Sequence, residues 1–321
     1  MGDPYRLHLN LQDSNDFSGS PIGIAGAGRV AQALGRLLAA HGEPVACIAS
    51  RSIEHARKAA AFIGYSVRAV SYSEIARHTG RILIAVSDSA IESVASALDM
   101  QTGIVLHTCG NCGPEALRIV SGGVFRGAIH PLQTISDPGT GAAALHGAAF
   151  AISGDGPAVA WAEQIARAAN GRILRIPDER RPLYHAAAVM ASNYVTALLS
   201  AAQTLLIAAD VNPDDALAAL GPIARSSLDN VLRQGPVAAL TGPIERGDVS
   251  TISSHLAALK EIPGPIPSLY RAAGLQALEL ARKKGLCAER AAATERLLEA
   301  SLQYEASLEY QAPVEYQAPV V

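Results

Sequence analysis

Residues 22–34 constrain the fold of this chain more than any other stretch. They read IGIAGAGRVAQAL: four small or apolar residues, typical of a strand buried on both faces, then glycines, then a helical pattern. Gly26, Gly28 and Ala31 match the G-x-G-x-x-G/A spacing, which allows a tight turn, backbone contact with a pyrophosphate, and close packing of helix on sheet. The helix N-terminus would offer free N–H groups to the phosphates. The stretch predicts a dinucleotide site; the alternative is a tight turn without a ligand.

Alternation of strand and helix patterns follows the glycine turn. Strands are expected at 44–49, 67–70, 81–86, 103–107 and 124–130, and two more, 147–153 and 171–176, flank a helix at 157–169. Residues 178–210 contain few helix breakers and are rich in Ala and Leu from His185 on, which predicts one long helix over 178–210. A helix start at 212–215 and helices at 223–234, 251–259, 268–284 and 288–306 are expected after it.

This order predicts the fold class α/β: a doubly wound, mostly parallel Rossmann-type sheet followed by an all-α C-terminal domain. We expect a loose lead-in at 1–20, a dinucleotide-binding domain at 21–176 and a helical domain at 177–306. The tail, 307–321, repeats the hexapeptide EYQAPV and is expected to be extended.

Composition excludes several classes of function. The net charge is −3 and aromatic residues make up 4% of the chain, so neither a nucleic-acid nor an anionic-membrane partner is expected. The apolar runs are interrupted short of a membrane span, and the first residues lack the apolar core of a signal peptide. Four cysteines in 321 residues do not suggest a disulfide framework. We expect a cytoplasmic protein.

The tip of the second strand decides between NAD and NADP. It reads Ser50-Arg51-Ser52, with hydrogen-bond donors and no carboxylate, and Arg29 adds charge near the phosphates. This pattern favours NADP over NAD; the alternative is that Arg51 is only solvated. The expected cofactor-binding residues are Gly26, Gly28, Arg29, Val30, Ser50, Arg51, Ser52, Val86, Ser87, Asp88, His107 and Thr108.

Two histidines, His107 and His130, end strands on the side of the sheet where ligands bind. A structural role for each, with hydrogen bonds to the backbone, is the alternative. Cys109 and Cys112 form a C-x-x-C, which is either a redox pair, half of a zinc site, or a loop of small residues facing the nicotinamide. Because no second metal-binding pair accompanies it, we expect the loop and no metal.

Four motifs together resemble a known family: VLHTCG at 105–110, AIHPLQ at 128–133, YHAAAVMASN at 184–193 and ALTGPIERGD at 239–248. They are similar to bacterial NADP-dependent oxidoreductases with a Rossmann-like N-terminal domain and a helical C-terminal domain of unknown function. That family resembles pyrroline-5-carboxylate reductase, ketopantoate reductase, and the 6-phosphogluconate and 3-hydroxyacid dehydrogenases in layout. The His-Pro-Leu step is similar to the His-Pro-Met of prephenate dehydrogenases.

The chain departs from these families at two places. Cys109 stands where the family commonly has Ser, and position 189 is Val where 3-hydroxyacid dehydrogenases carry a catalytic Lys. The resemblance therefore implies a reductase without a lysine-dependent mechanism. We expect hydride transfer between NADP(H) and a small polar carbonyl or imine compound, such as a keto acid. A non-catalytic NADP(H)-binding sensor or scaffold is the alternative.

The expected catalytic residues are His130, His185, Asn193 and Arg246. His130 and His185 would act as acid and orienting groups, Asn193 as a donor to the substrate heteroatom, and Arg246 as an anchor for a substrate carboxylate. Eight residues apart on one helix, His185 and Asn193 would share a broad face. The same helix is apolar on more than one face, at Leu198, Leu199, Leu205, Leu206 and Ile207. This pattern predicts a homodimer through the helical domain; burial within one subunit is the alternative.

Overall fold

The computed structural model describes residues 17–300, which pack as two compact units divided after Tyr194. The expected lead-in at 1–20 and tail at 307–321 therefore lie mostly or wholly outside the described residues. The division falls later than residue 177 because the helix that begins at Arg181 hydrogen-bonds to the sheet unit. Tyr184 Oη lies 2.7 Å from His130 Nδ1, and Ser192 Oγ lies 2.6 Å from Thr134 Oγ1.

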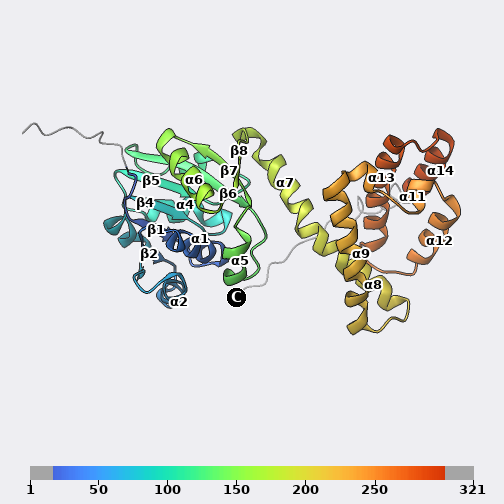
Figure 1. The fold of residues 1–321 in the computed structure, drawn as a ribbon, viewed down its shortest axis with the longest axis horizontal. Helices are drawn as coiled ribbons and strands as arrows, with labels where there is room; N and C mark the ends of the chain where they lie inside the picture. The colour runs from blue at the N-terminus through green and yellow to red at the C-terminus, as the bar shows by residue number, and fades with distance from the viewer. Residues whose placement is uncertain (1–16, 301–321) are drawn as a thin grey trace, which may run out of the picture. The chain divides into compact units, whose positions relative to one another are not determined.

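The first unit is a three-layer α/β/α domain (Figure 1). Eight strands within residues 17–300 form one sheet in the order β3-β2-β1-β4-β5-β6-β7-β8. All neighbouring strands are parallel except β6 and β7. The strands are Ile22–Ala25 (β1), Val45–Ala49 (β2), Arg68–Val70 (β3), Arg81–Ile84 (β4), Gly103–His107 (β5), Val124–Leu132 (β6), Ala149–Gly154 (β7) and Arg172–Leu174 (β8). The predicted doubly wound, mostly parallel sheet is confirmed.

Helices cover both faces of this sheet. One apolar core packs beneath α1, α2 and α6, and the other beneath α3 and α4. The helices are Arg29–Ala40 (α1), Ile53–Ile63 (α2), Tyr72–Ile75 (α3), Ile91–Ala97 (α4), Pro138–Ala144 (α5), Gly156–Ala168 (α6) and Arg181–Ala191 (α7). Short 3-10 turns lie at Ala76–His78 (η1), Asp88–Ala90 (η2), Pro114–Leu117 (η3) and Asp178–Arg180 (η4). The two layers leave the carboxyl ends of β1, β2, β4 and β5 at one edge.

The predicted single helix over 178–210 is wrong in one respect, because it breaks at Ser192. There φ is −121° and ψ −74°, which ends α7 before Asn193–Ala208 (α8) begins. His185 and Asn193 thus lie on two different helices, on either side of the break. Taken as one stretch, Asp178–Ala208 contains an 18-residue window with a mean hydropathy of 1.2 and, by length and composition alone, could cross a membrane. The expectation that every apolar run is too short does not hold for it.

The second unit is all helical, as predicted. It contains most of α8, then Pro213–Gln234 (α9), Pro236–Ala239 (α10), Pro243–Arg246 (α11), Val249–Leu259 (α12), Ile266–Lys284 (α13) and Ala288–Glu299 (α14). The predicted separate helix from residue 223 is the second half of α9, which runs on through Pro222 although an interior proline removes a backbone N–H and crowds the preceding turn. Ile252, Leu256 and Leu298 form its core.

Candidate functional site

The glycine turn between β1 and α1 has the geometry that its sequence predicts. Gly26 has φ +125°, and a Cβ there would lie 2.1 Å from the backbone oxygen of Ala85, so only glycine fits. Gly28 is the N-cap of α1, and a Cβ on it would meet no atom within 4 Å. No acidic residue occupies the first turn of α1. The turn therefore offers open backbone N–H groups to an anion at the helix N-terminus.

A hollow of about 970 Å³ opens at this edge of the sheet. It is bounded by the glycine turn, the tip of β2 and the segment after β4. All but two of the predicted cofactor residues line it: Gly26, Gly28, Arg29, Val30, Ser50, Arg51, Val86, Ser87, Asp88 and Thr108. The size and this lining fit a dinucleotide, with the pyrophosphate over Gly28.

The two remaining predicted residues, Ser52 and His107, have other partners. Ser52 caps α2, because its hydroxyl accepts a hydrogen bond from the backbone N–H of His55 at 3.4 Å. Among residues that sequence reasoning missed, His55 and Tyr72 also line the hollow, beside Arg51. Burial raises the pKa of Tyr72, while the charge and backbone N–H of Arg51 oppose that rise. No carboxylate lies among Ser50, Arg51, His55 and Tyr72, so this end of the hollow suits a phosphate.

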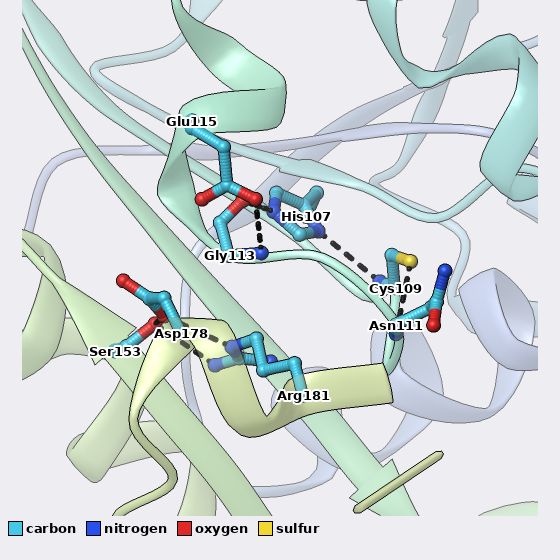
Figure 2. Close-up of polar contacts among 8 residues, drawn as sticks. All are labelled: His107, Cys109, Asn111, Gly113, Glu115, Ser153, Asp178 and Arg181. Atoms are coloured by element: carbon cyan, nitrogen blue, oxygen red, sulfur yellow. Dashed lines mark hydrogen bonds and ion pairs between the residues drawn. The ribbon is translucent and has the colours of Figure 1, made fainter. Parts of the chain in front are cut away.

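His107 is fully buried and holds the loop that follows β5 (Figure 2). Its Nε2 lies 2.8 Å from the Gly113 carbonyl oxygen, and its Nδ1 accepts from the backbone N–H of Cys109 at 3.2 Å. Burial lowers the pKa of His107, so the ring is neutral and donates through Nε2. Both ring nitrogens are used within the loop, which is the structural alternative raised above. A carboxylate oxygen of Glu115 also accepts from the Gly113 N–H, at 2.8 Å.

A buried arginine lies beside this loop (Figure 2). The Arg181 side chain is fully buried; its Nε pairs with Asp178 Oδ1 at 3.1 Å and its Nη2 donates to Ser153 Oγ at 2.9 Å. Its Nη1 has no hydrogen-bond partner among the described residues. Sequence reasoning missed Arg181, since an arginine at a helix start carries no signal of burial.

His130, Tyr184 and His185 form a cluster of rings on β6 and α7. Tyr184 Oη and His130 Nδ1 are 2.7 Å apart, and the two imidazoles meet edge to face with centroids 5.8 Å apart. Burial, assisted by the charges of His185 and Arg181, lowers the pKa of His130 to about 4. Burial raises the pKa of Tyr184 to about 12. The structure thus brings together two of the four predicted catalytic residues and adds Tyr184.

Asp88 lies at the hollow and acts electrostatically on the ring cluster. It lines the hollow, and its charge acts on both His130 and Cys112. Asn193 is the exposed first residue of α8, at the end of the first unit. Arg246 belongs to the second unit, where it ends α11 and its carbonyl accepts from Arg290 Nη1 at 3.1 Å.

Cys109 and Cys112 are free thiols, as are Cys47 and Cys287. Burial raises the pKa of Cys109 to about 12 and also raises that of Cys112, so both stay protonated at neutral pH. Within residues 17–300 no three His, Cys, Asp or Glu side chains are placed to hold a metal ion. The two cysteines of the C-x-x-C therefore lie, as protonated thiols, in a loop of small residues next to the hollow.

Two family models match the chain. Residues 21–109 match the family described as NADP oxidoreductase, coenzyme F420-dependent, and residues 148–277 match a domain of unknown function, DUF2520. The chain thus combines an NADP oxidoreductase domain with a DUF2520 domain. This confirms the predicted family and its cofactor, NADP. None of the curated protein sequences matches the chain.

Solved structures share the fold of the chain. A Thermotoga maritima protein is 22% identical, with a TM-score of 0.66 over 82% of this chain and 99% of its own. A Bacteroides fragilis protein, provisionally described as an NADP oxidoreductase, is 23% identical, with a TM-score of 0.65 over 84% and 99%. The pyrroline-5-carboxylate reductase of Streptococcus pyogenes is 16% identical, with a TM-score of 0.55 over 88% and 98%.

Proposed function

We propose that this NADP oxidoreductase transfers a hydride between NADP(H) and a small polar carbonyl or imine compound. One observation carries the proposal: a single unit holds both a dinucleotide-sized hollow and the His130–His185 ring pair, and the charge of Asp88, which lines the hollow, acts on His130. When bound, NADPH would supply the hydride. The protein residues would bind and orient the substrate and hold a proton near its heteroatom.

Each residue has a distinct part in this proposal. The Gly28 backbone and the α1 N-terminus would hold the pyrophosphate, and Arg51 the 2′-phosphate. His130 and His185 would face the substrate heteroatom. Asn193 and Arg246 stay candidates for binding the substrate, the second as a partner for a carboxylate.

The function is tested by combining binding and turnover. Calorimetry should detect NADPH binding, and NADPH oxidation should be observed with members of a panel of 2-keto acids, small ketones and cyclic imines. With an active substrate, His130→Gln and His185→Gln should each lower kcat about 100-fold while NADPH binding is retained. Tight NADPH binding without turnover anywhere in the panel would favour the non-catalytic sensor.

We also propose a homodimer through the helical unit. None of the residues of α8 is buried and none carries a charge, and Val195, Leu198 and Ile207 are each at least 40% exposed. The exposed apolar surface of such a helix is normally buried against another element, and α8 of a second copy of the chain would bury it. A membrane is a poorer cover, because α8 alone would reach about 24 Å at 1.5 Å per residue, short of a bilayer core of about 30 Å. Light scattering at micromolar concentration should give twice the mass of one chain, and a monomer would refute the proposal.

A further inference from the structure

Two imidazole nitrogens converge on one small volume beside Gly110. A Cβ built on Gly110 would lie 2.9 Å from His130 Nε2 and 2.7 Å from His185 Nδ1. Both nitrogens therefore pack against Gly110, where any side chain would press on the two rings. The glycine keeps both ring nitrogens uncovered, close enough together for one ligand atom on their other side to reach both. Gly110 itself is buried in the loop that follows β5.

Tyr184 determines which nitrogen of His130 carries the proton. Among the described residues, the Tyr184 hydroxyl forms a hydrogen bond with His130 Nδ1, at 2.7 Å. The tyrosine keeps its proton at neutral pH, because burial raises its pKa to about 12, so the hydroxyl donates to Nδ1. The neutral ring then carries its own proton on Nε2, the nitrogen that lies next to Gly110.

His185 supplies the second group. Its Nδ1 is buried and has no hydrogen-bond partner among the described residues. A buried ring nitrogen without a partner is destabilising, so a ligand atom that hydrogen-bonds to it would recover free energy. The two nitrogens are thus an available pair next to a hollow that fits NADP.

The charges around the pair favour an oxygen that becomes negative. Beyond burial, His185 and then Arg181, on the same helix, lower the pKa of His130 by their positive charge. Asp88 at the edge of the hollow acts in the opposite direction and more weakly than either of these two. A protonated imine would bring a positive charge and N–H donors to a place that already holds a cation and an N–H donor. A carbonyl oxygen would bring an acceptor whose negative charge grows during reduction.

We propose that His130 and His185 bind the oxygen of a carbonyl substrate, with Tyr184 as the positioning residue of His130. The inference rests on the proposed reductase function and narrows its substrate class from carbonyl or imine to carbonyl.

The proposed step balances as follows. The carbonyl carbon receives a hydride from the reduced nicotinamide, the two-electron reductant, and the π electrons of the C=O bond move to the oxygen. That oxygen takes the Nε2 proton of His130 while Nδ1 takes the proton of Tyr184, and solvent protonates the phenolate again. The products are an alcohol and the oxidised cofactor. Because an alkoxide is a much stronger base than a phenolate, the proton moves in this direction.

The tautomer is tested without any substrate. In ¹⁵N-histidine-labelled protein saturated with NADP⁺, NMR at pH 7 should show His130 neutral, with its proton on Nε2; His130→Gln assigns the signal. Tyr184→Phe should mix the two tautomers of His130. The matched control is Tyr270→Phe, because Tyr270 Oη makes a similar contact, 2.9 Å, with His255 Nδ1 in the second unit. A proton on Nδ1, or an imidazolium at pH 7, would overturn the inference.

The substrate class is tested with matched pairs: cyclopentanone against 1-pyrroline, cyclohexanone against 1-piperideine, and 2-keto acids against their cyclic imines. We expect the carbonyl member to be reduced at least 10-fold faster in kcat/KM. Tyr184→Phe should lower its kcat about 10-fold and change its pH profile with little effect on KM, while Tyr270→Phe changes neither. Faster reduction of the imines overturns the oxygen assignment and leaves the reductase function intact. NADPH binding with no turnover of either member contradicts the reductase function, and this inference with it.

Discussion

Arg51 should decide the preference of this protein for NADPH over NADH. Its side chain is exposed and lines the hollow beside Tyr72, and no carboxylate lies at the tip of β2 to bind a free ribose hydroxyl. A hydrogen bond between charged groups contributes about 1.5–3 kcal/mol. Arg51→Ala should therefore weaken NADPH binding about 10- to 150-fold, since each 1.4 kcal/mol is a factor of ten. NADH has no 2′-phosphate, so its affinity should change little.

Titration calorimetry of both cofactors on the wild type and the variant measures this effect. The matched control is Arg57→Ala, because Arg57 is an exposed arginine on the neighbouring helix α2 and does not line the hollow. The NADPH effect should shrink as salt rises, since exposed charges are screened. Equal losses for both cofactors, or a wild type that binds NADH as tightly as NADPH, would refute the reasoning.

Three further predictions concern single side chains. Gly26→Ala should abolish NADPH binding in calorimetry, because its methyl group would lie 2.1 Å from a backbone oxygen; unchanged affinity would contradict the geometry of the turn. Glu43→Gln should destabilise the first unit by about 3 kcal/mol, because it leaves the buried Arg81 guanidinium, paired at 3.0 Å, without its counter-charge. Urea unfolding, followed by the fluorescence of Trp161, the single tryptophan, measures this free energy. A loss of less than about 0.5 kcal/mol, which is typical of an ordinary surface substitution, would count against the prediction. His130 has a folded pKa of about 4 against an ordinary 6.5, so the unfolded chain binds more protons between these values. The contribution of His130 to the free energy of unfolding should be complete above pH 6.5 and fall by up to about 3 kcal/mol as the pH is lowered to 4. His130→Gln should remove this pH dependence.

The cofactor half of the site could be predicted from local sequence alone. Gly26 and Gly28 have their roles because of backbone geometry within one strand–turn–helix, and Ser50 and Arg51 follow from the end of the next strand. Parallel strands place these ends at one edge of the sheet, so the lining of the hollow follows from the order of the elements. Tyr72 escaped prediction because its place depends on the short strand β3, whose register a sequence does not specify.

The substrate half depends on tertiary contacts that no spacing rule records. His107 and His130 look equivalent in sequence, since both end strands at the ligand edge. The Gly113 carbonyl and the Cys109 N–H bind both nitrogens of His107, whereas His130 keeps one nitrogen free beside Gly110. The difference comes from the path of the loop after β5. Helical periodicity also did not predict the break between His185 and Asn193, because Ser192 makes a hydroxyl contact with Thr134 in another element.

Arg181 explains why the ring cluster belongs to the sheet unit rather than to the helical one. Its guanidinium is fully buried against Asp178 and Ser153, and removing a buried partner of this kind costs about 3–5 kcal/mol. The start of α7 is thereby fixed to the end of β7. Tyr184 and His185 lie one turn further along α7, so the same contact determines their positions relative to His130. The geometry of the proposed oxygen site therefore comes from contacts within the first unit.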